Sequence, residues 1–381
     1  MTICRLAGGA LALIITGAAW ADAPLPAEHL TVTQMPPPNP HRLYVLDDAF
    51  ANEIDFRIHV FDGDTYRRLG QLDAGYYASW NLSPDGGTSA IGTTYFARGS
   101  HGARTDVVEF ADNQTLAWTH EIVLPPKRAH TLPTPFGLAY SADSHLVYVS
   151  YVTPAASFGV LDPAKGSVLG EIDTAGCVLV IPSGNYRVSS ICENGKFLTV
   201  NLDAQGKEWG RSYSQAFFDP DADPVFVQGV AIPGGWAFLS FLGQVHEVDF
   251  SGDQPMARAP WTLVSAAEKG HWRPGGTQVG TYNGHLHRLY VPMHEGGEGS
   301  HKVGGTEIWV FDTKEHRRIA RWPMARYKLS AALGVHVTSD DQPLLFVATD
   351  KADVAVIDAS SGRLRHVEPH LGQTPWFMLT H

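Results

Sequence analysis

Short runs of alternating apolar and polar residues, each followed by a polar turn, recur along the whole chain. Residues 57–75 read RIHVFDGDTYRRLGQLDAG: one alternating stretch ends at Asp62, a turn follows at Gly63-Asp64, and a second stretch runs through Arg68–Leu72. Side chains on a strand point alternately to its two faces, so this pattern is typical of a β-hairpin with one buried face. We expect a β-hairpin over residues 57–75.

The same hairpin pattern occurs seven times, and an aspartate closes the first strand of each copy. These residues are Asp62, Asp112, Asp162, Asp203, Asp249, Asp312 and Asp358. They are separated by 50, 50, 41, 46, 63 and 46 residues. Periods of this size, without helical stretches between the copies, indicate four-stranded sheets repeated around an axis. The sequence therefore predicts an all-β, seven-bladed β-propeller, in which the aspartates form turns rather than acid–base pairs.

The two ends of the repeat region predict how the ring closes. His41–Asp48 forms the first strand, and together with the first hairpin it gives blade one three strands. Gln373–Thr380 is apolar and aromatic and has no partner after it. A ring in which this last strand completes blade one leaves no open sheet edge. We therefore expect residues 41–381 to form one closed propeller.

Residues 1–21 have the features of a cleavable signal peptide. Arg5 supplies the positive charge, Leu6–Ala18 is an apolar run too short to span a bilayer comfortably, and Ala19-Trp20-Ala21 fits the small-x-small cleavage rule. The mature chain is predicted to begin near Asp22, with an alternative cut after Ala23. No later apolar run reaches the length of a membrane span, so we expect an exported, soluble protein.

Residues 22–40 are rich in proline and show no periodicity, which predicts an extended arm before the propeller.

Export to an oxidising compartment determines how the three cysteines are interpreted. Cys4 is removed with the signal, which leaves Cys177 and Cys192 as a pair in an oxidising compartment and favours a disulfide. Two buried free thiols are the alternative. Zinc binding is disfavoured because there is no CxxC motif.

The amino-acid composition bears on the fold class, the number of domains and the possible binding partners. The chain has 381 residues, of which 44% are hydrophobic and 18% are charged, with 38 glycines and 25 prolines. This composition suits many short strands joined by turns. Length alone would allow two or three domains, but the repeat argues for one. A formal charge of −11 argues against nucleic-acid binding through a basic surface.

Three kinds of chemical site were considered, and none has strong support. His285 and His287 are predicted to lie on a strand, which places both imidazoles on one face, and histidines and glutamates follow at residues 294–301. Polar surface is the favoured interpretation over a metal site. There is no GxSxG nucleophile motif, and the Gly-rich run at residues 295–305 does not lie between a strand and a helix. Residues 97–104 are predicted to be an inserted loop. The chain is therefore either a binding module or a subunit whose chemistry lies on another chain.

Several short motifs occur in an order and spacing that carry a family resemblance. They are Arg42–Val45, Thr93–Tyr95, Arg104–Glu109, Glu121–Arg128, Gly176-Cys177, Ile191-Cys192, Asp249–Asp253, Trp272–Gly276, His301-Lys302 and Glu307–Val310. With these motifs the chain resembles the heavy subunit of the tryptophan tryptophylquinone amine dehydrogenases. Among them it is more similar to aromatic amine dehydrogenase than to methylamine dehydrogenase.

The resemblance implies a propeller that scaffolds a small, cysteine-rich light subunit in a periplasmic α2β2 heterotetramer. The tryptophan tryptophylquinone and the catalytic base would lie in that light subunit, so no catalytic residue, cofactor or metal is assigned to this chain. The assembly would oxidise primary amines, with aromatic amines favoured, to aldehydes and ammonia. Electrons would pass to a blue-copper protein of the azurin or amicyanin type.

One residue of this chain is assigned to the substrate channel by the same resemblance. In the family a phenylalanine after the blade-one hairpin lines the channel mouth, and Tyr76 occupies the matching position after Asp73-Ala74-Gly75. Its added hydroxyl group needs a partner if it is buried. The simpler interpretation is that Tyr76 only opens a strand of blade two.

The sequence is also compatible with two other functions. A stand-alone exported propeller that binds a ligand or partner without catalysis would need nothing beyond the repeats. A metal-dependent propeller hydrolase or lactonase would need carboxylate and asparagine side chains that converge on the central channel.

Overall fold

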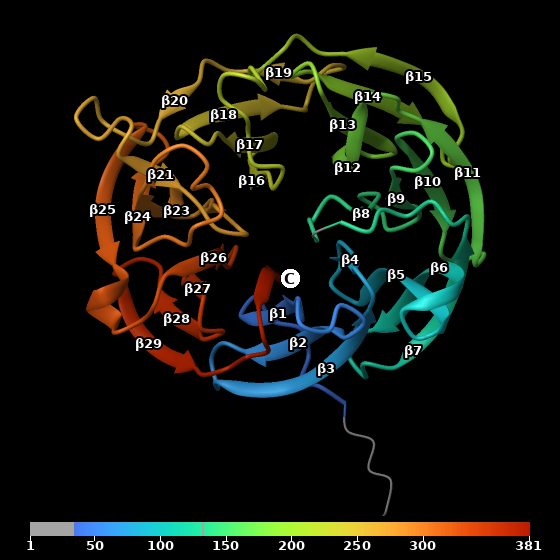
Figure 1. Ribbon diagram of the computed structural model, residues 1–381, viewed down its shortest axis with the longest axis horizontal. Helices are drawn as coiled ribbons and strands as arrows, with labels where there is room; N and C mark the ends of the chain where they lie inside the picture. The colour runs from blue at the N-terminus through green and yellow to red at the C-terminus, as the bar shows by residue number, and fades with distance from the viewer. Residues whose placement is uncertain (1–33, 132) are drawn as a thin grey trace, which may run out of the picture. The chain divides into compact units, whose positions relative to one another are not determined.

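The structure is a computed structural model, and it describes residues 34–131 and 133–381. Within the unit Met35–His381, seven antiparallel sheets follow one another around a central axis (Figure 1). The predicted seven-bladed propeller is therefore confirmed. The predicted signal peptide and residues 22–33 of the predicted arm lie outside the described residues.

Blades one to four each contain four strands, named here from the axis outward (Figure 1). Blade one has β30 (Pro375–Thr380), β1 (Arg42–Asp47), β2 (Phe56–Asp62) and β3 (Arg67–Gly75); blade two has β4 (Ser79–Leu82), β5 (Thr88–Arg98), β6 (His101–Asp112) and β7 (Trp118–Leu124). Blade three has β8 (Leu138–Tyr140), β9 (Val147–Tyr151), β10 (Ser157–Asp162) and β11 (Ser167–Asp173); blade four has β12 (Cys177–Gly184), β13 (Arg187–Cys192), β14 (Phe197–Leu202) and β15 (Glu208–Tyr213).

Blades five and six each carry one extra short strand. Blade five has β16 (Val230–Ile232), β17 (Gly235–Leu239) and β18 (Gln244–Asp249), with β19 (Met256–Ala257) and β20 (Trp261–Thr262) both paired to β18. Blade six has β21 (Trp272–Pro274) and β22 (Thr281–Asn283), both paired to β23 (Arg288–Glu295), then β24 (Glu307–Asp312), β25 (Arg317–Pro323) and the 3-10 helix η1 (Met324–Tyr327). Blade seven has β26 (Ala332–Val337), β27 (Leu344–Thr349), β28 (Val354–Asp358) and β29 (Arg363–Glu368).

The hydrophobic core lies between neighbouring blades. Middle strands such as β9 and β10 are buried along their whole length, because another blade covers each face. The outer strand β15 alternates between partly buried and exposed residues. These two patterns follow from burial on two faces or on one. Between blades one and seven, Leu43 and Val45 pack with Phe346 and Val354, and all four are fully buried.

The aspartates of the repeat form the hairpin turns, as predicted. Asp62 Oδ1 accepts hydrogen bonds from the backbone N–H groups of Asp64 and Thr65, each at 2.9 Å. In the other six copies an aspartate oxygen likewise accepts a backbone N–H from two or three residues later. These carboxylates act locally on the backbone, which is a turn-forming role.

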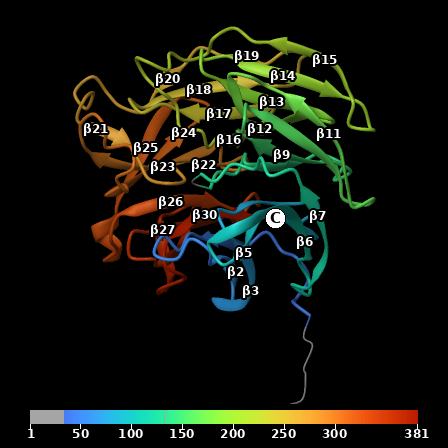
Figure 2. The same cartoon turned by 45° about the vertical axis from the view of Figure 1, so that its right-hand side comes forward.

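The last strand completes blade one, as predicted. β30 pairs antiparallel with β1, with Tyr44 opposite Leu379 and Val45 opposite Met378. Figure 2 shows β30 beside β26 of blade seven, and the two strands are in contact. The first and last strands of the propeller thus share one sheet.

A glutamine from blade six holds the axial edge of β30. Gln278 Nε2 donates to the carbonyl oxygen of Met378 at 3.0 Å, and its Oε1 accepts the Met378 N–H at 2.8 Å. Thr277 Oγ1 donates to the carbonyl oxygen of Trp376 at 2.6 Å. The amide of Gln278 takes the place of a neighbouring strand, so the buried backbone groups of Met378 are satisfied.

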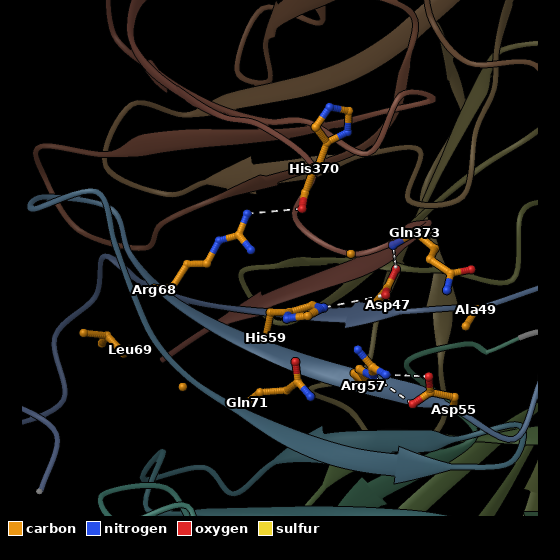
Figure 3. Close-up of a pocket in the computed structure, with 12 residues that line it drawn as sticks. Asp47, Ala49, Asp55, Arg57, His59, Arg68, Leu69, Gln71, His370 and Gln373 are labelled. Atoms are coloured by element: carbon orange, nitrogen blue, oxygen red, sulfur yellow. Dashed lines mark hydrogen bonds and ion pairs between the residues drawn. The ribbon is translucent and has the colours of Figure 1, made fainter. Parts of the chain in front are cut away.

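The turn before β30 is fastened by Asp47, at the end of β1 (Figure 3). Asp47 Oδ1 accepts the backbone N–H groups of Gln373 at 2.8 Å and Thr374 at 2.6 Å, and Oδ2 lies 3.6 Å from His59 Nε2. Gly372 has φ +95°, and a Cβ there would lie 2.3 Å from Asp47 Cγ. Glycine is therefore required at 372, because any side chain would be strained and would collide with Asp47.

Two local predictions were wrong. Residues 97–104 are not an inserted loop: they mostly extend β5 and β6, whose hairpin turns at Gly99-Ser100. His285 and His287 do not lie on a strand but in the turn between β22 and β23, where His287 has φ +52°. Composition does not distinguish the two structures in these stretches, because glycine and histidine occur in strand ends and turns alike.

The described end of the predicted arm packs on the propeller. Residues 35–39 form no helix or strand and lead to a turn at Pro40, and the side chain of Met35 is buried in the cluster formed by blades one and two. Its backbone N–H donates to the carbonyl oxygen of Gln114 at 2.9 Å. Among residues 34–131 and 133–381, no helix is both long and apolar enough to cross a membrane.

Cys177 and Cys192 form a disulfide between β12 and β13. They are directly opposite each other in the strand register, and both are buried. The bond joins two adjacent strands of blade four, 15 residues apart in sequence. It therefore closes a short loop in the unfolded chain.

Replacing both cysteines by serine is expected to lower the free energy of unfolding by about 3 kcal/mol, the chain-entropy value for a loop of this length. Urea unfolding without reductant measures the change. Reductant should lower the wild-type midpoint and leave that of the variant unchanged. Equal midpoints for the two proteins would contradict the expected stabilisation.

Candidate functional site

One end of the propeller axis is hollowed into a large, mostly apolar cavity. Its volume is about 790 Å³, and its lining includes residues from all seven blades. The inner strands β4, β12, β26 and β30 begin at this end, so their first residues and the preceding loops form the wall. The apolar lining residues include Phe50, Val178, Phe226, Phe241, Leu333 and Trp376.

Exposed apolar side chains surround the mouth of this cavity. Phe50, Val152, Val178 and Val227 line it and remain 39–47% exposed. We call these four residues the apolar rim. Exposed apolar side chains that line a cavity are typical of a protein–protein or ligand-binding site. The axial cavity and its rim are therefore the candidate functional site of the described residues.

Tyr76 lies beside the cavity rather than in its wall. It follows β3, and its half-buried ring makes edge contacts with Tyr77, Phe96 and His130, at centroid distances of 4.7, 5.7 and 5.0 Å. Ser79 lines the cavity three residues later. We call the four rings the aromatic cluster. The role of Tyr76 in a substrate channel stays a prediction.

The backbone of the aromatic cluster is held by a buried arginine. Arg128 is 2% exposed, and its guanidinium donates to the carbonyl oxygens of Tyr76 at 2.8 Å and Tyr77 at 2.5 Å. Its Nη2 also donates to Thr94 Oγ1 at 2.9 Å. Arg128 lies within one of the motifs of the resemblance, Glu121–Arg128, but the sequence alone did not show that its side chain turns inward.

The charges around the aromatic cluster differ between its two sides. On one side, burial and the neighbouring guanidinium of Arg128 lower the pKa of His130 to about 4, so this imidazole is neutral at pH 7. On the other side, Tyr77 donates to Glu53 at 2.8 Å, which raises the pKa of Tyr77 to about 12. Burial, together with the adjacent Asp47 and Glu53, raises the pKa of Asp48 to about 7. The ionisable groups next to Tyr77 are therefore acidic, and the raised pKa leaves Asp48 partly protonated at pH 7.

The histidines considered as metal ligands are spread over separate environments. His294 is buried, and its Nε2 lies 3.0 Å from Ser300 Oγ. His301 lines the axial cavity and stacks on Phe241 at a centroid distance of 4.1 Å. In the part of the chain that the structure describes, no three histidine, cysteine or carboxylate side chains are grouped so that they could hold a metal ion.

Comparison with known proteins places this architecture in a family. The methylamine dehydrogenase heavy chain family matches residues 39–381, which include the propeller, the axial cavity and the aromatic cluster. The chain belongs to this family. A methylamine dehydrogenase heavy chain from Methylobacillus flagellatus is 25% identical over 357 residues, covering 93% of this chain and 88% of that protein. The corresponding protein of Paracoccus versutus is 26% identical over 360 residues, covering 93% and 83%.

A solved structure extends the comparison to the fold alone. Dihydro-heme d1 dehydrogenase NirN aligns with a TM-score of 0.55 and 16% identity, over 87% of this chain and 64% of that one. For the methylamine dehydrogenase heavy chain family, the match covers every blade of the present chain. The sequence-based resemblance is thus confirmed for amine dehydrogenase heavy chains, and the closer similarity to aromatic amine dehydrogenase stays a prediction.

Proposed function

We propose that this chain is the heavy subunit of a periplasmic amine dehydrogenase, in which a separate, cysteine-rich light subunit carries the tryptophan tryptophylquinone and the catalytic base. The assembly is an α2β2 heterotetramer that converts primary amines, preferentially aromatic ones, to aldehydes and ammonia. It passes the electrons to a blue-copper protein. The observation that carries this proposal is the match to amine dehydrogenase heavy chains over residues 39–381.

The axial cavity and the apolar rim support the proposal that this end of the propeller is the binding site for another polypeptide. Burying the rim would remove exposed apolar area from water at about 25 cal/mol per Å². Hot spots of protein interfaces are enriched in large side chains that fill pockets on the partner. We assign the light subunit to this end of the propeller, with its contact surface centred on the cavity.

Trp272 and Trp309, the two tryptophan rings that contact each other among the described residues, are poorly suited to form a quinone. Trp272 and Trp309 lie next to each other, with ring centroids 5.0 Å apart, but Trp309 is fully buried. The guanidinium of Arg318 covers Trp309 at 4.0 Å, and that of Arg321 covers Trp272 at 4.5 Å. A quinone supplies an electrophilic carbonyl that the substrate amine must reach, which this packing prevents. The arrangement supports placing the cofactor on the light subunit.

The aromatic cluster supports a preference for aromatic amines. Its rings lie beside the cavity, and Glu53 accepts a hydrogen bond from the hydroxyl group of Tyr77. An aromatic amine presents a cationic ammonium group and a ring, which carboxylates and aromatic side chains attract respectively. In this proposal Tyr76 contacts the ring of the substrate on its way to the light subunit.

Substitution of Tyr76 by alanine tests the substrate preference. In the reconstituted enzyme, Tyr76→Ala should lower kcat/KM for benzylamine relative to methylamine by about three- to tenfold, the value of one aromatic contact. Tyr76→Phe keeps the ring and should retain the wild-type ratio. A Tyr76→Ala enzyme with an unaltered substrate profile would remove Tyr76 from the channel.

The subunit assignment is tested by co-purification. The tagged chain, isolated from the periplasm of its source cells, should bring down a small disulfide-rich protein, and the mixture should absorb visible light. The chain expressed by itself should be colourless, because it lacks the quinone. Isolation of the tagged chain without a companion, from cells that are oxidising amines, would favour a stand-alone propeller.

A further inference from the structure

Arg128 makes an unusual set of contacts for a fully buried cation. Its two terminal nitrogens donate to the carbonyl oxygens of Tyr76 and Tyr77, two consecutive residues, and to Thr94 Oγ1. Among residues 34–131 and 133–381 no carboxylate forms an ion pair with its side chain, since the nearby Asp106 is bound by Arg104 through both carboxylate oxygens at 2.7 and 2.8 Å. The guanidinium therefore donates its hydrogen bonds to carbonyl and hydroxyl oxygens, and the negative charge of the nearby Asp106 acts on it without direct contact.

Burial of a guanidinium without a direct ion pair lowers the stability of the fold. We therefore expect Arg128 to have a role other than stabilisation. A charge removed from water is destabilising unless it is well paired, and an apolar side chain of similar volume often stabilises a core as well or better. The benefit of arginine here is geometric, because its planar fork can hold two carbonyl groups at fixed positions. Tyr77 has φ +47°, an uncommon conformation for a residue with a side chain, so the loop needs such support.

Arg128 is itself held in place by residues of the β5–β6 hairpin, through its backbone and through Thr94. Thr94 Oγ1 donates to Asp106 Oδ1 at 2.8 Å and lies 2.9 Å from His130 Nε2. The backbone N–H of Arg128 donates to Asp106 Oδ2 at 3.0 Å, and Arg104 donates to the Arg128 carbonyl oxygen at 2.8 Å. The long β5–β6 hairpin therefore fixes Arg128, and Arg128 fixes the loop that carries the aromatic cluster.

We propose that Arg128 is a positioning residue for substrate selection: it sets the place of the Tyr76 ring beside the cavity and acts on the substrate only through that ring. The inference rests on the proposed function, in which Tyr76 contacts the amine. Arg128 itself lies beneath the loop and does not touch the substrate. Lysine at this position would keep the charge but could not hold both carbonyl groups in the same geometry.

The test is a double-mutant cycle in the reconstituted enzyme, read as the ratio of kcat/KM for benzylamine to that for methylamine. Arg128→Lys should lower the ratio by about threefold or more, in the same direction as Tyr76→Ala. In the Tyr76→Ala background, the same substitution should have no further effect on the ratio, because residues that act through one another are not additive.

Arg42→Lys is the matched control. Arg42 is 1% exposed and also donates to loop carbonyl oxygens, those of Pro36 and Pro37, at the start of β1. Arg42→Lys should lower thermal stability, as Arg128→Lys does, while it leaves the substrate ratio at the wild-type value. A shift of the ratio by both substitutions would show a general effect of lost stability and would overturn the inference.

The possible failures can be told apart. If Tyr76→Ala shifts the ratio and folded Arg128→Lys does not, the positioning role is wrong and the proposed channel stands. If Tyr76→Ala has no effect, the channel assignment is wrong, and the positioning role with it. Should Arg128→Lys not fold, Thr94→Val removes one partner of Arg128 at nearly constant volume and should lower the ratio by about twofold. A folded Thr94→Val enzyme with the wild-type ratio would overturn the inference.

Discussion

Removal of residues 375–381 is expected to abolish cooperative folding of the propeller. The truncation deletes β30, which carries the fully buried Phe377 and Met378, and exposes the inner edge of β1. Loss of buried side chains of this size costs about 2–5 kcal/mol each, against a total stability of about 5–15 kcal/mol for a typical protein. Gln278 would also lose both hydrogen bonds to Met378. Circular dichroism should show no single thermal transition.

Deletion of His381 alone is the control for the truncation. His381 is exposed and lies after the last strand, so its removal should leave the melting temperature within about 2 °C of the wild type. A synthetic peptide of residues 373–381, added to the truncated chain, should restore part of the transition. A truncated chain with wild-type melting would contradict closure of the ring through β30.

Introduction of two carboxylates into the apolar rim is expected to prevent binding of the light subunit. In the double variant Val178→Glu and Val227→Glu, the proposed interface would bury two charges without partners, at a cost of several kcal/mol. The dissociation constant should rise by about 100-fold or more, because each 1.4 kcal/mol corresponds to a factor of ten. Both valines are already exposed, so the fold should be retained. Titration calorimetry with purified light subunit measures the change.

Val168→Glu is the matched control for the rim variant. Val168 is also an exposed valine, but it lies on the outer strand β11, two residues after the hairpin turn that follows Asp162. This end of the blade is opposite the end where the inner strands begin. Its substitution should leave the dissociation constant unchanged. Equal affinities for the rim variant and the wild type would show that the light subunit does not bind at the axial cavity.

The number of blades could be predicted because each blade contains the same local sequence pattern. An alternating strand followed by an aspartate turn depends only on neighbouring residues, and this signal located the hairpins of all seven blades. Closure by Gln373–Thr380 could be predicted as well, because an apolar strand without a partner must be covered. The boundary between strands and loops could not be predicted as well. Residues 97–104 have the mixed composition of a loop, although most of them belong to β5 and β6.

The candidate site was largely invisible in the sequence, since its parts come together only in three dimensions. The axial cavity takes residues from all seven blades, and no short motif joins them. Gln278 and Arg128 look like ordinary surface residues in sequence, yet both are buried and bind backbone atoms of residues far away in the sequence. Tyr76 could be selected only through the family resemblance. Its neighbours Phe96 and His130 follow at 20 and 54 residues' distance, too far apart for a local pattern.

The central claim is that catalysis lies on the light subunit and that this chain binds and positions it. The activity of the separated subunits tests this claim most directly. Purified heavy and light subunits would be assayed apart and after recombination, with benzylamine as the donor and a blue-copper protein as the acceptor. We expect the heavy subunit to be colourless and inactive, and recombination to restore amine-dependent reduction of the copper. Amine oxidation by the purified heavy subunit, with no second chain present, would contradict the account.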